Sequence, residues 1–249
     1  RRNSGDTGKE IWLNLNRRIA RLYRPAARKL FPLLMQDIWH NVYMLNGKSG
    51  FKWKYSLGHP LQHAVFLVSM DELKTRTVLL SGNKLVLLNE TGKIARNFPV
   101  TLPARFAPAQ LACGREGERH LIMVVSENGI ARAYDGTGRL LPNWKDRNLQ
   151  GSLIGRPRFI SHHGEVKVLT LHKNGMVNLL DLNGRAAPGF PLHFQAPLRP
   201  ASFLHQAPEG RRLTFLTAEG EKITIDLDGK LHSRKRICVG GKELSLLPA

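Results

Sequence analysis

Short runs of apolar residues alternate with polar turns along most of the chain, in an order that repeats. Each copy has an apolar run, a polar turn, a second apolar run that ends near Asp or Asn, a glycine turn and a third run. Runs of this length bounded by Gly, Asn and Asp are typical of short strands with one buried face. The pattern predicts an all-β chain.

The last glycine of the second turn marks the period of the repeat. These glycines are Gly50, Gly92, Gly138, Gly184 and Gly229, and they are separated by 42, 46, 46 and 45 residues. Glycine supplies the positive φ that tight hairpin turns require, and repeats of this length fit four-stranded propeller blades. A β-sandwich also has short strands, but it does not explain the period. We therefore expect a β-propeller, or a propeller segment, of about five four-stranded blades.

The repeats also suggest the domain organisation. Residues 1–27 are expected to form a basic N-terminal segment and residues 28–249 the propeller. The predicted units lie near residues 30–60, 76–108, 118–157, 165–200 and 210–249. One blade cannot bury both of its faces, so neighbouring blades must stack and a ring must close. The run 243–247 is a candidate closing strand for the first blade.

A helical period precedes the repeats. Ile11, Leu15, Ile19 and Leu22 fall on one helical face, which predicts a short amphipathic helix over residues 10–24 that ends at Pro25. The candidate contacts to an anionic surface are Arg17, Arg18, Arg21, Arg24, Arg28 and Lys29. The helix could lie on an anionic membrane surface or bind an acidic partner, or it could simply pack against the propeller.

The charge of the chain is strongly positive. It has 38 Lys and Arg against 19 Asp and Glu, a net charge of +19. Such a surface attracts anionic partners, including acidic proteins, anionic membranes and nucleic acid. Nucleic acid is an alternative and not the favoured partner, since the sequence has no zinc finger, recognition helix or aromatic RNA-binding strand.

The turn phrases resemble the PQQ-type repeats of quinoproteins, as in LNGKSGFKW at residues 45–53. A closer likeness is to the C-terminal propeller of large uncharacterised cell-envelope proteins of Bacteroidetes-type bacteria. It is carried by LNETGKIARNFPVTL at residues 88–102, by Gln36-Asp37 and by Tyr134-Asp135. The resemblance implies a non-catalytic role at the bacterial cell envelope, periplasmic or associated with the outer membrane. No signal segment is visible in this chain, which is compatible with a processed product or with an excised fragment that lacks its targeting segment.

No catalytic constellation is evident, so we do not expect an enzyme, a cofactor or a small-molecule substrate. A quinone- or metal-dependent enzyme is the least favoured alternative, because quinone-dependent dehydrogenases need a cofactor stacked on Trp and a larger, eight-bladed disc. The turns that begin at Asp181 and Asp226 resemble calcium loops, but they lack the bidentate Glu of such loops. Hairpin turns account for them.

Two histidine pairs come nearest to metal-ligand spacing. His59 and His63 are four residues apart, but Pro60 interrupts the helix that this spacing would need. His162 and His163 are adjacent, and neighbouring side chains on a strand point to opposite faces. We therefore predict no metal site.

Only two cysteines occur, Cys113 and Cys238. Their number excludes a disulfide-dense scaffold or a zinc site made of cysteines alone. Their pairing is left open, as are the oligomeric state and the blade count of any longer protein. The function expected is a propeller scaffold that binds a protein or another anionic macromolecule at the cell envelope.

Overall fold

The computed structural model describes residues 19–23, 33–46, 50–68, 75–106, 109–208 and 210–237. The chain divides into two compact units, residues 1–61 and 62–249. The described residues form twenty strands and one short 3-10 helix, η1 (Ala104–Phe106). None of their helices is long and apolar enough to cross a membrane.

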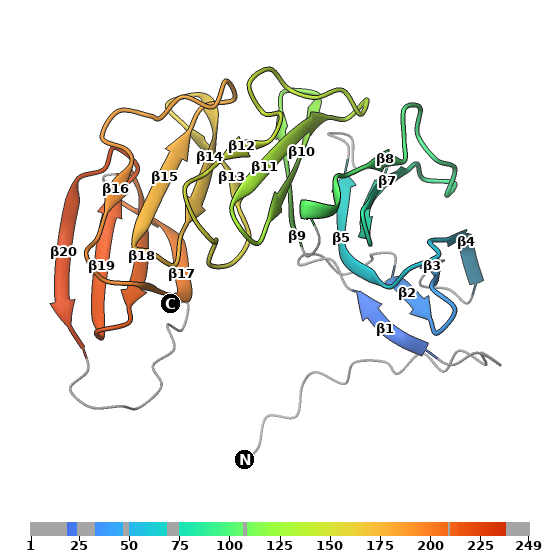
Figure 1. Cartoon of the computed structure of the whole chain (residues 1–249), viewed down its shortest axis with the longest axis horizontal. Coiled ribbons are helices and arrows are strands. Elements are labelled where there is room, and N and C mark those ends of the chain that lie inside the picture. The colour runs from blue at the N-terminus through green and yellow to red at the C-terminus, as the bar shows by residue number, and fades with distance from the viewer. Residues whose placement is uncertain are drawn as a thin grey trace, which may run out of the picture. The chain divides into compact units, whose positions relative to one another are not determined.

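The strands form five four-stranded antiparallel sheets, called blades 1 to 5 in chain order (Figure 1). Blade 1 comprises β1 (Ile19–Tyr23), β2 (Leu33–Asp37), β3 (Asn41–Asn46) and β4 (Gly50–Ser56). Blade 2 comprises β5 (Leu61–Val68), β6 (Thr75–Ser81), β7 (Lys84–Leu88) and β8 (Val100–Thr101). Blade 3 comprises β9 (Ala109–Glu116), β10 (Arg119–Ser126), β11 (Ile130–Asp135) and β12 (Arg147–Asn148). Blade 4 comprises β13 (Arg158–His162), β14 (Glu165–Leu171), β15 (Met176–Leu180) and β16 (Leu192–His193). Blade 5 comprises β17 (Leu198–Ala207), β18 (Gly210–Thr217), β19 (Glu221–Asp226) and β20 (Leu231–Arg236).

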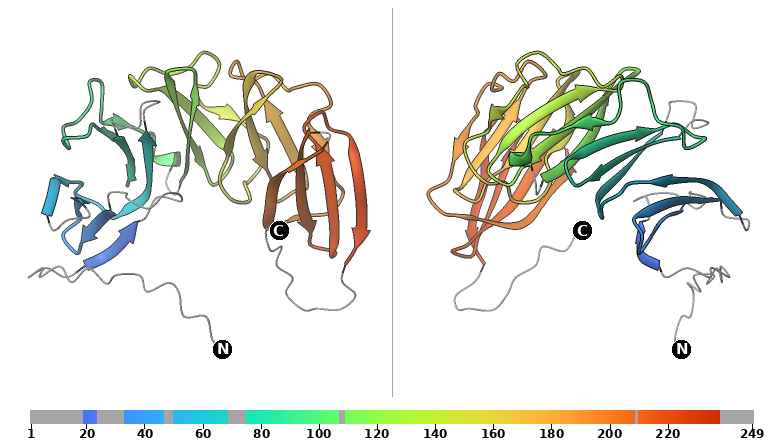
Figure 2. Two further views of the ribbon diagram at one scale, coloured as in Figure 1. Left: turned by 180° about the vertical axis from the view of Figure 1, so that it is seen from behind. Right: turned by 45° about the vertical axis from the view of Figure 1, so that its right-hand side comes forward.

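Every blade is an up-and-down meander, and blades 2 to 5 follow one another in chain order (Figure 1 and Figure 2). Their first strands lie side by side. Strand β9 contacts β13, and the Arg158 guanidinium on β13 donates to the Ser202 carbonyl oxygen on β17 at 3.1 Å. The fourth strands β8, β12 and β16 have only two residues each, which leaves little edge for pairing with another chain. The arrangement is an all-β, propeller-like fold, as the repeat predicts.

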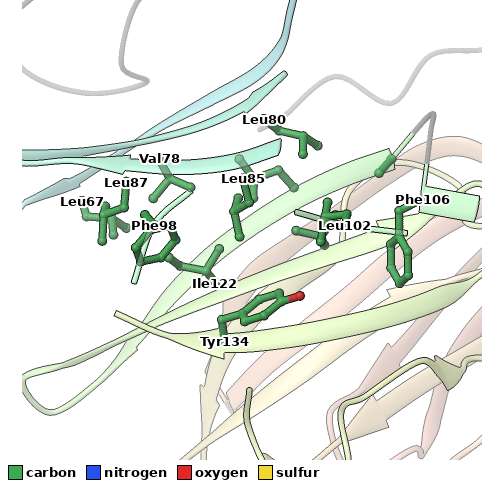
Figure 3. Packing of buried hydrophobic residues seen from close by; sticks show 13 residues of the cluster. Leu67, Val78, Leu80, Leu85, Leu87, Phe98, Leu102, Phe106, Ile122 and Tyr134 are labelled. Carbon is green, nitrogen blue, oxygen red and sulfur yellow. The ribbon is translucent and has the colours of Figure 1, made fainter. Parts of the chain in front are cut away.

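An aromatic residue from each of blades 2, 3 and 4 packs against the next blade. Phe98 lies in one buried cluster with Ile122 and Tyr134 of blade 3 (Figure 3). Trp144 packs with residues of blade 4 and donates its indole N–H to the Leu182 carbonyl oxygen at 2.7 Å. Phe190 occupies the corresponding place between blades 4 and 5. Each blade thus completes the core of its neighbour, as stacked repeats require.

The Asn or Asp of the glycine turn has the same role in four blades. In blade 4 the Asp181 Oδ1 accepts hydrogen bonds from the backbone N–H groups of Asn183 and Arg185 at 2.9 and 2.7 Å. Equivalent pairs of bonds are made by Asn89, Asp135 and Asp226. The side chain therefore satisfies two backbone donors of a tight turn. These bonds explain why Asn and Asp recur at this position.

The glycines of the turns allow blades to approach closely. Gly92, Gly138, Gly184 and Gly229 all have positive φ, between 78° and 85°. A Cβ on Gly229 would lie 2.6 Å from the Gly189 carbonyl oxygen of blade 4, and a Cβ on Gly189 would collide with the Asp228 carbonyl oxygen. Gly50 differs, since it is the first residue of β4, paired in register with Asn46.

The structure corrects the predicted N-terminal helix in part. Residues 19–23 form strand β1, antiparallel to β2, so a helix over 10–24 is wrong for this part; residues 10–18 and 24 lie outside the described residues. The reason is that β2 needs an edge partner to complete a four-stranded blade, and tertiary pairing overrides a helical period.

The third run of the predicted repeats is a strand in blades 1 and 5, where it forms β4 and β20, but largely not in blades 2 to 4. The segments after Gly92, Gly138 and Gly184 make only isolated bridges, such as Leu180 with Ala186, and then insert the aromatic residue between blades. The missing strand is the first one of each blade, which lies before the predicted start of the unit. The run 243–247 lies outside the described residues.

Cys113 on β9 has a free thiol, and burial raises its pKa above the ordinary value. Cys238 lies outside the described residues.

We expect Gly189→Ala to lower the free energy of unfolding by about 2–4 kcal/mol, because a left-handed alanine and an overpacked contact both cost stability. Gly155→Ala is the matched control. Gly155 has φ +70° and nothing within 4 Å of an added Cβ, so only the conformational cost of about 1 kcal/mol applies. Urea unfolding monitored by tryptophan fluorescence measures both variants. Equal losses would show that the approach of blades 4 and 5 at Gly189 is not tight.

The role of the turn acid gives a second test. Asp181→Asn should leave stability nearly unchanged, since Asn89 performs the same task in blade 2. Asp181→Ala should cost about 1–3 kcal/mol, because two backbone donors lose their acceptor. The same unfolding assay distinguishes the variants, and a neutral alanine would contradict the assignment.

Candidate functional site

The basic residues singled out near the N-terminus lie largely beyond the described residues. Arg17, Arg18, Arg24, Arg28 and Lys29 are outside them. Arg21 belongs to β1, where it is paired in register with Gln36. Their contact with an anionic surface stays a prediction.

A basic cavity of about 750 Å³ lies on blade 5. Its lining residues are Leu204, His205, Gln206, Arg212, Thr214, Lys222, Thr224, His232, Ser233 and Lys235. Side chains alternate between the faces of a strand, and the neighbours Phe215 and Ile223 pack into the core shared with blade 4. The cavity therefore lies on the face of blade 5 that points away from blade 4. No Asp or Glu is among these described lining residues.

Two lysines of this cavity are direct cross-strand partners. Lys222 of β19 is paired in register with Lys235 of β20. Like charges directly opposite each other destabilise an antiparallel pair, and a bound anion would relieve the repulsion. In the same cavity, the hydroxyl groups of Thr214 and Thr224 share a hydrogen bond of 2.9 Å. The Thr214 hydroxyl also lies 3.2 Å from the His205 Nε2. The cavity thus combines cations with hydroxyl groups, as suits an anionic ligand.

Two further cavities are basic as well. One of about 710 Å³ between the turns of blades 2 and 3 is lined by Arg76, Arg96 and Arg139 and by one acidic residue, Asp135. Another of about 580 Å³ beside β9 and β13 includes Arg156 and Arg158. Burial lowers the pKa of Arg158, whose guanidinium donates hydrogen bonds to the carbonyl oxygen and the hydroxyl of Ser202. Positive charge is therefore distributed over several concave places of residues 62–249.

Two acidic side chains of the described residues, Asp146 and Glu221, form ion pairs with arginines. Asp146 is held by Arg132 at 2.7 Å and by Arg105 at 2.5 Å, and the hydrogen bond from Arg132 is the main reason why the pKa of this carboxyl group is lowered. Glu221 pairs with Arg234 at 2.8 Å, which lowers the pKa of Glu221. Asp146 and Glu221 thus serve local structure, and the Asp226 Oδ2 lies 2.9 Å from the Nε2 of His232, a lining residue of the blade 5 cavity.

The two adjacent histidines converge, contrary to expectation. His162 ends β13, whereas His163 lies in the following turn with φ 50°, so the alternation of a strand does not apply to it. The Nε2 atoms of His162 and His163 lie 2.8 and 2.9 Å from the same Asp228 Oδ1 of blade 5. These two hydrogen bonds lower the pKa of Asp228. In the other histidine pair, the His63 Nδ1 accepts a hydrogen bond of 3.2 Å from Arg156.

Comparison with known proteins shows the fold but no family. No protein-family model matches the sequence, and the search of curated proteins finds no match. Among solved structures, BBS1N in complex with ARL6DN has a TM-score of 0.58 at 16% identity, covering 82% of this chain and 64% of that chain. KlHsv2 with an engineered loop 6CD has a TM-score of 0.61 at 7% identity, covering 91% and 71%.

The computationally designed Ika8 protein has a TM-score of 0.58 at 14% identity, covering 86% of this chain and 60% of that one. The chain therefore spans less than two thirds of BBS1N and of Ika8. At these identities the likeness concerns the fold alone, and it agrees with a propeller-like arrangement of four-stranded blades.

Repulsion between Lys222 and Lys235 predicts an unusual response to mutation. Lys222→Gln should raise the free energy of unfolding by about 0.2–1 kcal/mol at low salt, because it removes a like-charge cross-strand pair. The gain should shrink at high salt, where charges are screened. Lys230→Gln, an exposed lysine of the neighbouring turn, is the control. Urea unfolding at two salt concentrations measures the effect, and a loss of stability at low salt would contradict it.

Proposed function

We propose that this protein is a non-catalytic propeller scaffold that binds an acidic protein partner at the bacterial cell envelope through its basic cavities. The observation that carries the proposal is the Lys222–Lys235 pair in a cavity with no acidic lining residue. Two like charges directly opposite each other cost stability, and an opposing charge would offset that cost. An acidic side chain of a partner would supply that charge.

Two further observations support a protein as the partner. The net charge of +19 would speed the association with acidic surfaces and make it dependent on salt. BBS1N, which resembles this chain in fold, was solved in complex with ARL6DN, so a propeller-like module of this kind can serve as a docking platform. The envelope location rests on the likeness of residues 88–102 to envelope propellers.

The binding test uses a fluorescent peptide of alternating Glu and Asp, with anisotropy measured between about 50 and 200 mM salt. The double variant Lys222→Glu/Lys235→Glu should weaken binding at least about tenfold, since like charges would face the peptide. Lys145→Glu/Lys173→Glu removes the same charge at exposed positions outside the cavity and should change affinity much less.

Equal losses for the two double variants would mean that only net charge matters, and they would overturn the cavity as the site. Duplex DNA and single-stranded RNA are measured alongside the peptide. Tighter binding of nucleic acid than of the peptide at physiological salt would favour the nucleic-acid alternative. Location is tested by fractionating source cells, and recovery of the chain in the cytosol would contradict an envelope role.

A further inference from the structure

Among the described residues, one group of three side chains offers metal-ligand atoms within 4.8 Å of one another. It comprises His162 and His163 of blade 4 and Asp228 of blade 5. We propose that these three side chains form a zinc-binding site that links the β13–β14 turn to the β19–β20 turn. The site is distinct from the basic cavity, and it stands whether or not the proposed function is correct.

The geometry is close to what zinc requires. Zinc lies about 2.0–2.2 Å from nitrogen and oxygen ligands, so tetrahedral ligand atoms are about 3.3 Å apart. The two nitrogen-to-oxygen distances are now 2.8 and 2.9 Å and need to open by only about half an ångström to meet that spacing. His163 and Asp228 are 73% and 61% exposed and can adjust, whereas His162 is 15% exposed and fixes one ligand.

The ligand types select the metal. Two imidazole nitrogens and one carboxylate oxygen suit zinc and its late first-row neighbours, whereas calcium and magnesium prefer sites made of oxygen atoms. Three protein ligands would leave a fourth position for water or for a group from a partner, as in zinc sites with an open position. The single carboxylate also balances part of the zinc charge.

The backbone around the site is already in place. His163 and Gly164 both have positive φ, 50° and 77°, which matches a two-residue type I′ turn closed by the pairing of His162 with Glu165. A histidine in this conformation is uncommon, and here the turn directs its ring toward blade 5.

The other side of the site is fixed by contacts between blades. The Asp228 backbone packs against Gly189 so closely that a Cβ there would collide. Nearby, the Arg211 Nη1 donates to the Ser161 carbonyl oxygen at 3.3 Å. These contacts hold the two turns together without a metal, which reduces the ordering needed for metal to bind.

The test titrates untagged, chelator-treated full chain with Co²⁺, whose visible absorption reports tetrahedral nitrogen and oxygen ligands, and then displaces Co²⁺ with Zn²⁺. We expect one site per chain, with micromolar or tighter zinc affinity and a higher Tm in the presence of zinc. Asp228→Asn keeps an acceptor for both imidazoles but removes the charged ligand. His163→Asn suits the left-handed turn and removes one imidazole. Each should lose on the order of 100-fold in zinc affinity, at least as much as loss of an outer-shell partner costs.

His193→Ala is the matched control, since His193 is an exposed histidine on blade 4. It should bind Zn²⁺ like the wild type. Zinc affinity weaker than millimolar, or equal affinity in Asp228→Asn and the wild type, would overturn the proposal. Unfolding of each variant without metal is measured in parallel. Because Asp228→Asn and His163→Asn suit the apo fold, a variant that folds normally and still binds zinc is decisive against the site.

Discussion

The close approach of consecutive blades is the constraint on which the rest of the structure depends. A single four-stranded meander has two faces that carry apolar side chains, and only a neighbour can cover them. Blades 2 to 5 meet through an aromatic residue, Phe98, Trp144 or Phe190, that each blade extends into the next core. Between blades 4 and 5, Gly229 meets Gly189 with no room for a side chain. The glycine period is therefore as much a packing requirement as a turn requirement.

The packing of consecutive blades explains which parts of the fold can be predicted from the sequence. Second and third strands such as β10 and β15 are rich in buried apolar residues, because neighbouring blades cover them. The turn that follows the third strand can also be recognised, because its Asp or Asn side chain accepts two backbone hydrogen bonds. The blade count and the all-β class follow directly from these two signals.

The first strands could not be found in the same way. Strand β9 is only partly buried, and its sequence, AQLACGRE, mixes small, polar and apolar residues. Such strands are selected by pairing with the next strand rather than by a buried face. Strand β1 shows the converse problem, because its helical spacing of Ile and Leu is overridden by pairing with β2. The local pattern of apolar and polar residues therefore does not identify an edge strand, because such a strand forms only by pairing with the rest of its sheet.

The histidine cluster was missed because strand alternation was applied to His163, which lies in a turn. A signal was present, since His163 and Gly164 end a strand as an Asn-Gly pair would in a two-residue hairpin. No sequence rule, however, could have brought in Asp228, 65 residues away, because its position depends on how blade 5 packs on blade 4. The basic cavity was equally hidden, since Lys222 and Lys235 face each other only through the register of β19 and β20.

The polar outer face of blade 5 has a consequence for the behaviour of the protein in bulk. Stacked repeats offer a template for further copies wherever their terminal face is apolar, and chains then polymerise end to end. Lys222 and Lys235 make that face repel its own counterpart, because two copies meeting there would bring four ammonium groups together. The same charges that we assign to recognition therefore oppose self-association of the protein through this face, and salt should weaken that opposition.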